Sequence, residues 1–156
     1  MSDVKAIPEG FSTVTPHLVC RNCADAIEFY KKAFGVQDMG RMIEPNTKKI
    51  IHAMIKIGDS FIMLVDHFPN WDNASPESLG GTPVTIHLYV EDADSFVKKA
   101  VDAGAKITME LMDSFWGDRY GKIVDPFGHE WSIATHIKDV SPEEMEEAAK
   151  QMFGQQ

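Results

Sequence analysis

Residues 15–19, Thr-Pro-His-Leu-Val, return 70 positions later as residues 85–89, Thr-Ile-His-Leu-Tyr. Both stretches are rich in strand-forming residues and are bounded by polar turn residues. An amphipathic stretch follows each of them and contains Phe-Tyr-Lys-Lys-Ala at 29–33 in the first copy and Phe-Val-Lys-Lys-Ala at 96–100 in the second. The stretches end at Gly35 and Gly104, as a helix C-terminus favours. The chain therefore contains an internal repeat in which a strand leads into a helix.

Extended runs complete each copy of the repeat after its helix. The first copy has such runs at 38–43 and 49–57, the second at 106–111 and 120–124, and residues 58–63 align with 128–133. Each copy thus predicts one strand, one helix and three strands. We expect an α+β fold in which two tandem βαβββ modules form a cup-like mixed β-sheet half-barrel. We expect a single domain, with modules at about 12–66 and 83–137 and a linker at 67–82 that is rich in Pro, Gly, Ser and Asn.

The composition of the chain limits the kinds of molecule that it can bind. The 156 residues include 15 Lys and Arg against 24 Asp and Glu, which gives a net charge of −9, and 44% of them are hydrophobic. This describes a compact acidic domain, and its charge argues against nucleic-acid and membrane-surface partners. No apolar run is long enough to span a membrane, and the first residues do not resemble a secretory leader, so we expect a cytoplasmic location.

The end of the sequence predicts one more helix, at about 141–153. Ser141 is a good helix cap, Pro142 suits the first helical position, and Glu144 completes a capping box. An apolar stripe runs along this helix and should dock on its own sheet or on a partner subunit. Because each module also leaves sheet edges uncovered, we expect a homodimer.

Cys20 and Cys23 form a Cys-x-x-Cys pair just before the first predicted helix. A redox pair would need a thiol activated at the helix N-terminus, and a zinc site would need two further ligands. The other interpretation is that both are small buried residues where a strand meets a helix. The sequence leaves these alternatives open.

Several motifs resemble a known family. They are Ala-Ile-Glu-Phe-Tyr-Lys-Lys-Ala-Phe-Gly at 26–35, Phe-Trp-Gly-Asp-Arg at 115–119 and Asp-Pro-Phe-Gly-His-Glu-Trp-Ser-Ile-Ala-Thr-His at 125–136. Together with the repeat, they resemble the vicinal oxygen chelate superfamily, which includes glyoxalase I, extradiol dioxygenases and bleomycin-resistance proteins, and within it the PhnB-like branch. The resemblance covers about residues 12–137.

The resemblance implies a metal site. Members that use a divalent metal, such as Zn, Ni, Mn or Fe, hold it with His and Glu side chains on the first and last strands of each module. The first-strand positions are His17 and His87 here, whereas the last-strand positions fall at Ile62 and Ser132, which offer no carboxylate. His52 stands where PhnB-like relatives have His-Ala-Glu, and we take it as a further candidate ligand. The alternative is that no metal is bound and the histidines line a ligand site.

Four more residues are candidates for the site. Glu130, on the same strand face as Ser132, is a candidate further ligand or general base. Arg119 offers a guanidinium that suits a carboxylate or phosphonate group of a substrate; alternatively, it pairs with Asp118 or Asp125 and holds its turn. Trp116 and His136 are assigned to substrate binding with Arg119. His136 shares the face of Glu130 if the strand alternates regularly.

Two functions follow from these assignments. The first is a glyoxalase-related enzyme, a metal-dependent lyase, isomerase or dioxygenase that acts on a small molecule. The second is a metal-free, bleomycin-resistance-like protein that sequesters a cationic or aromatic compound. Two symmetric histidines favour the enzyme, and the missing carboxylates together with the acidic charge favour the binding protein. In either case we expect His17 and His87 to face one shared cup.

Overall fold

A computed structural model describes residues 3–154 of the chain. The chain divides into two compact units, one that ends at Thr82 and one that begins at Pro83. No helix within the described residues is both long and apolar enough to cross a membrane.

The first unit is a βαβββ module. Its elements are β1 (His17–Cys20), α1 (Cys23–Phe34), β2 (Gln37–Ile43), β3 (Ile50–Ile57) and β4 (Ser60–Asp66). The strands form one sheet in the order β1-β4-β3-β2, in which β1 runs parallel to β4 and the other pairs are antiparallel.

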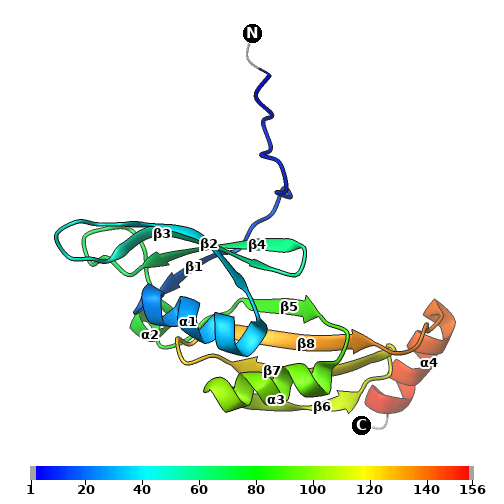
Figure 1. Cartoon of the computed structure of the whole chain (residues 1–156). Coiled ribbons are helices and arrows are strands. Elements are labelled where there is room, and N and C mark those ends of the chain that lie inside the picture. Colours follow the sequence, from blue (N-terminus) through cyan, green and yellow to red (C-terminus); the bar gives the residue numbers. More distant parts are fainter. Residues whose placement is uncertain (1–2, 155–156) are drawn as a thin grey trace. The chain divides into compact units, whose positions relative to one another are not determined.

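Helix α1 covers one face of this sheet (Figure 1). Asn22 caps its first turn by accepting a hydrogen bond from the backbone of Asp25, and Gly35 ends it in the left-handed conformation. The helix buries Ala26, Ile27 and Tyr30.

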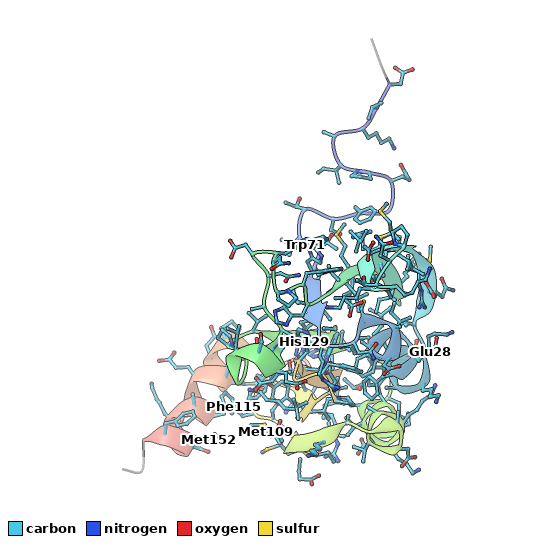
Figure 2. The ribbon with its side chains drawn as sticks, turned by 90° about the vertical axis from the view of Figure 1, so that its left-hand side faces the viewer. Glu28, Trp71, Met109, Phe115, His129 and Met152 are labelled. Carbon is cyan, nitrogen blue, oxygen red and sulfur yellow. The ribbon has the colours of Figure 1, made fainter. Side chains whose placement is uncertain are left out.

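The segment between the modules contains an element that the sequence did not predict. Helix α2 (Pro76–Leu79) is a single short turn, and Ser75 and Ser78 cap it reciprocally. Before it, Trp71 lies on the loop after β4 (Figure 2), and its ring stacks on Phe68 at 4.1 Å between centroids.

The second unit repeats the first. Its elements are β5 (Thr85–Tyr89), α3 (Ala93–Ala103), β6 (Lys106–Asp113), β7 (Asp118–Val124) and β8 (Glu130–His136). The sheet order is β5-β8-β7-β6, with β5 parallel to β8, and α3 covers one face (Figure 1). Two βαβββ modules with mixed four-stranded sheets confirm the α+β fold class that the repeat predicts.

The Asp-Pro-Phe-Gly-His motif at 125–129 stabilises the turn that precedes β8. Asp125 accepts hydrogen bonds from the backbone of Phe127 and of His129, at 2.9 and 3.0 Å, and from the indole nitrogen of Trp131 at 2.8 Å. Trp131 is fully buried in the core of the second unit. The motif therefore fixes where β8 begins and which of its faces meets the core.

Helix α4 (Pro142–Phe153) begins as expected, because Ser141 accepts a hydrogen bond from the backbone of Glu144 at 3.1 Å. None of its residues is buried, and Met152 and Phe153 remain 54% and 65% exposed. The docking of its apolar stripe stays a prediction.

The two cysteines lie in the core of the first unit and form no disulfide with each other. Burial, with a further contribution from the charge of Asp66, raises the pKa of Cys23 to about 12. A thiol with so high a pKa forms almost no thiolate near neutral pH. The structure therefore favours the interpretation that the pair packs the junction of β1 and α1.

Candidate functional site

Strand alternation gives the second sheet two different faces. Trp131 and Ile133 of β8 are buried on the face that α3 covers, so Ser132 and Ala134, which alternate with them, point to the other face, where neighbouring side chains leave them 3% and 0% exposed. The strand register brings side chains from β5 and β7 to the same face. We call this surface the second open face; it is formed by His87, Tyr89, Asp118, Tyr120, Lys122, Glu130, Ser132, Ala134 and His136.

His87 lies near the middle of the second open face. Its Nδ1 and the hydroxyl of Ser132 share a hydrogen bond of 2.7 Å. Its ring meets Tyr89 edge to face at 4.6 Å between centroids and lies nearly parallel to Tyr120 at 5.9 Å. Trp116 packs edge to face on Tyr120 at 5.4 Å. We call His87, Tyr89, Tyr120 and Trp116 the aromatic cluster.

The carboxylate of Asp118 holds the aromatic cluster in place by hydrogen bonds. Only 3% of this residue is exposed, and its carboxylate accepts hydrogen bonds from the hydroxyl of Tyr89 at 2.9 Å and from the indole nitrogen of Trp116 at 3.2 Å. Burial by itself would raise the pKa of Asp118, but the hydrogen bonds from His136, Tyr89 and Trp116 together hold it below its usual value. The hydrogen bond from Tyr89 to Asp118 raises the pKa of the Tyr89 phenol. The cluster is therefore built around a carboxylate that stays ionised.

His136 completes this network. Its Nδ1 lies 2.8 Å from Asp118 and its Nε2 lies 2.8 Å from Asp139. Hydrogen bonds to Asp139 and then to Asp118 raise the pKa of the imidazole. The regular alternation of β8 puts His136 on the same face as Glu130, as the sequence indicated.

Glu130 lies at the start of β8, where Thr85 donates a hydrogen bond to its carboxylate at 3.4 Å. It is two residues from Ser132, which is about 7 Å along the strand. Glu130 is thus on the second open face but at its edge, and its role as a general base stays a prediction.

Arg119 lies on the opposite face. Its guanidinium donates to Asp94 of α3 at 3.0 and 3.1 Å and to Asp113 of β6 at 3.2 Å. We expected Asp118 or Asp125 as the alternative partners of Arg119, but both accept hydrogen bonds from other donors. The reason is strand alternation, because Arg119 follows Asp118 directly and so points toward α3. Arg119 therefore fastens the helix to the sheet and is not on the face that bears His87.

The first sheet carries its own pair of imidazoles. His17 and His52 have ring centroids 6.3 Å apart. Burial and then the nearby His52 lower the pKa of His17, which favours the neutral imidazole. His17 and Trp71 also border a pocket of about 400 Å³, lined by His17, Val19, Ile51, Val65, Trp71, Asp72 and Asn73.

The residue beside His17 is different from the one that the repeat indicated. The parallel register pairs His17 with Met63, while Ile62 is 2% exposed and buried in the core. In the second unit the equivalent partner of His87 is Ser132, as aligned. The repeat is therefore offset by one residue at β4, and Met63 takes the position where metal-using relatives would have a carboxylate.

These side chains do not fit a divalent ion of the kind that the resemblance implies. The strand positions supply His17 and His87 as imidazoles, Met63 as a thioether and Ser132 as a neutral hydroxyl. Zn, Mn and Fe sites of this type rely on anionic oxygen donors, which both last-strand positions lack. In addition, Lys122 stands directly opposite Ser132 on the neighbouring strand, where its charge repels a cation. Among the described residues, no three His, Cys, Asp or Glu side chains gather as metal ligands would.

Sequence reasoning identified His87, Trp116 and His136 but missed the residues that join them. Tyr89 and Tyr120 were not singled out, and Asp118 was considered only as a partner for Arg119. One signal was available for Tyr89, because it lies two residues from His87 on a predicted strand and so shares its face. Tyr120 needed the register of β7 against β8.

Two successive βαβββ modules, each with a mixed sheet covered by one helix, define the class of the protein. The chain matches the Glyoxalase/Bleomycin resistance protein/Dioxygenase superfamily over residues 11–133. It belongs to this family, and the resemblance that its motifs indicate is confirmed.

The chain is also similar to individual proteins. The chain is 44% identical over 138 residues to protein Rv0887c of Mycobacterium tuberculosis, covering 86% of this chain and 81% of the relative. The crystal structure of At5g48480 from Arabidopsis thaliana is 31% identical, with a TM-score of 0.61 over 80% of this chain and 98% of that one. The PhnB protein of Bacillus cereus shares the fold at 16% identity, with a TM-score of 0.59 over 80% and 99% of the two chains.

Proposed function

We propose that the protein binds a small organic molecule on the second open face and does so without a divalent metal ion. The observation that carries this proposal is the aromatic cluster held by the buried carboxylate of Asp118. Rings that are fixed in place before binding offer apolar contact area at little cost in conformational entropy. Such a surface suits an aromatic ligand.

The donor set supports the metal-free form of the proposal. Met63 and Ser132 occupy the two positions at which a carboxylate would balance the charge of a metal ion. The same positions are compatible with an organic ligand, because a thioether provides adaptable apolar contact and a hydroxyl provides a hydrogen bond.

A metal-dependent enzyme is the second candidate. His17 favours it, because a lowered pKa keeps the imidazole neutral and His52 lies close enough to act with it. In that case His17, His52 and His87 are the proposed ligands and Glu130 is the proposed base. The reaction would be that of a lyase, isomerase or dioxygenase.

Metal analysis combined with binding separates the two candidates. Protein purified without a histidine tag is assayed for bound metal, and binding of 2-naphthamide and 2-naphthoate is measured before and after treatment with a chelator. The proposal predicts little bound metal and equal binding in both samples. Stoichiometric metal, with binding lost on chelation and restored by Zn or Mn, would support the metal-dependent enzyme instead.

We also propose that the protein is a cytoplasmic homodimer. The dimer is supported by exposed apolar side chains on the edge strands β2 and β6 and on α4, namely Met39, Met42, Ile43, Ile107, Met109, Met112, Met152 and Phe153. Figure 2 shows Met109 and Met152 on the second unit. Burying these side chains against a second copy would remove them from water.

A further inference from the structure

Lys122 is a cationic residue of the second open face that forms no ion pair within the described residues. Arg41, Lys98 and Arg119 each pair with a carboxylate within the described residues. Lys122 is half-buried on β7, and no carboxylate of the described part of the chain lies within ion-pairing distance of it. An ammonium without an anionic partner on this face is available to pair with an anionic group of a ligand.

The strand register places Lys122 at the end of a short row of donors. Lys122 is the direct partner of Ser132, and Ser132 is the direct partner of His87. All three therefore lie side by side on one face, across β7, β8 and β5. We call Lys122, Ser132 and His87 the polar row.

The polar row keeps a free hydrogen-bond donor in either tautomer of His87. If Ser132 donates to Nδ1, the neutral imidazole carries its proton on Nε2 and offers an N–H. If Nδ1 donates to Ser132, the hydroxyl proton of Ser132 is free to point elsewhere. An acceptor group placed on the row thus meets an ammonium and at least one neutral donor.

A second row lies beside the first. Ala134 is the direct partner of Tyr120 on one side and of Tyr89 on the other. Ala134 itself is fully buried, whereas Tyr89 is 65% exposed, so a planar ligand meets the tyrosine rings and not Ala134. The rows are two residues apart along β8, which is about 7 Å. This spacing fits an aromatic ring that carries a carboxylate.

The neighbouring charges agree with an anionic group on the polar row. Asp118 already accepts hydrogen bonds from Tyr89, Trp116 and His136. Glu130 lies at the far end of β8 and accepts from Thr85. The negative charges on this face are therefore occupied by their own donors, whereas Lys122 has none of them within reach.

We infer that the ligand of the second open face is an aromatic carboxylate, with its anionic group on the polar row and its ring against Tyr89 and Tyr120. This inference rests on the proposed function and adds the ligand class. It runs against the net charge of −9, because recognition depends on the charges that line the site and not on the total.

The test compares three matched probes by isothermal titration with the full chain: 2-naphthoate, neutral 2-naphthamide and cationic 2-naphthylmethylammonium. We expect 2-naphthoate to bind about tenfold more tightly than the amide, as a charge-assisted hydrogen bond allows. This advantage should shrink at high salt and disappear in Lys122→Gln. Lys106→Gln, which removes an exposed lysine at the start of β6, is the matched control and should keep it.

Each result has a distinct meaning. If 2-naphthoate and 2-naphthamide bind equally tightly, and Tyr120→Leu weakens the binding of both, the ligand does not need a carboxylate group. That result would contradict the inferred ligand class but would agree with the proposed function. Tighter binding of the cation would contradict the inferred ligand class as well. No binding of any probe at millimolar concentration would contradict the proposed function itself. If Lys122→Gln does not fold, Ser132→Ala should reduce the same advantage, with thermal melting as the check on folding.

Discussion

Asp118 is the residue on which the second open face depends most. Its carboxylate, where β7 begins, accepts hydrogen bonds from Tyr89, Trp116 and His136. Each of these donors comes from a different segment, so one buried acceptor sets the position of three site residues. Buried polar groups of this kind cost free energy when a partner is lost, because the remaining groups are left unsatisfied.

Replacing Asp118 by Asn should therefore destabilise the protein and loosen the site. We expect the free energy of unfolding to fall by about 1–3 kcal/mol, because the amide cannot accept all three hydrogen bonds. Denaturant unfolding measures this loss. Asp113→Asn, which removes an exposed carboxylate paired with Arg119, should change stability by less than about 0.5 kcal/mol. Equal effects of the two substitutions would show that Asp118 has no special role.

His136 should make stability depend on pH. Its pKa is raised in the folded protein from the ordinary value of 6.5, so folding favours the protonated imidazole. The stabilisation is complete below the unfolded pKa and is lost as the pH rises through the higher folded pKa. Unfolding curves from pH 5.5 to 9 should therefore show a decline on the alkaline side that is absent in His136→Gln. The same decline in both proteins would assign it to another group.

At the scale of the elements, the sequence repeat predicted both modules because strand and helix periods are local properties. The strands and helices of both units lie where the repeated motifs indicate. Helix α2 was missed because one short turn carries no periodic signal. The partner of His17 was misjudged by one residue, because pairing between distant strands depends on tertiary packing that spacing alone does not show. The aromatic cluster was hidden for the same reason.

The turn between β6 and β7 contains a glycine, Gly117, at a position that has no space for a side chain. Gly117 has φ of +100°, and a Cβ there would lie 2.0 Å from the carbonyl oxygen of Lys138. Its own carbonyl accepts hydrogen bonds from Ile137 and Lys138, at 2.9 and 3.0 Å. Gly117→Ala must therefore shift the turn that carries Trp116 and Asp118.

We expect Gly117→Ala to lower stability and to weaken binding of 2-naphthoate together. Gly40→Ala is the matched control, because Gly40 has φ of +121° but open space around the added Cβ. Strain at either position costs about 1–3 kcal/mol, so any excess in Gly117→Ala reports the clash. Thermal melting and titration would check this, and similar results for the two variants would contradict the expected displacement of the turn.

At the scale of the whole molecule, the chain belongs to a family whose fold serves several activities, so function must be argued from the site. The apolar side chains on β2, β6 and α4 predict association of two copies. Light scattering at micromolar concentration should give about twice the chain mass of 17.4 kDa. A monodisperse species near 17 kDa would contradict the homodimer.

We propose that the aromatic cluster and the polar row together form a ligand site that needs no divalent metal. The most direct measurement is an NMR titration of chelator-treated, isotope-labelled protein with 2-naphthoate, following the backbone amides. We predict that the largest shift changes fall at residues 85–89, 118–122 and 130–136, and that added Zn or Mn leaves them unchanged. Shift changes that centre on His17 and His52, and that appear only after metal is added, would contradict a metal-free ligand site on the second open face.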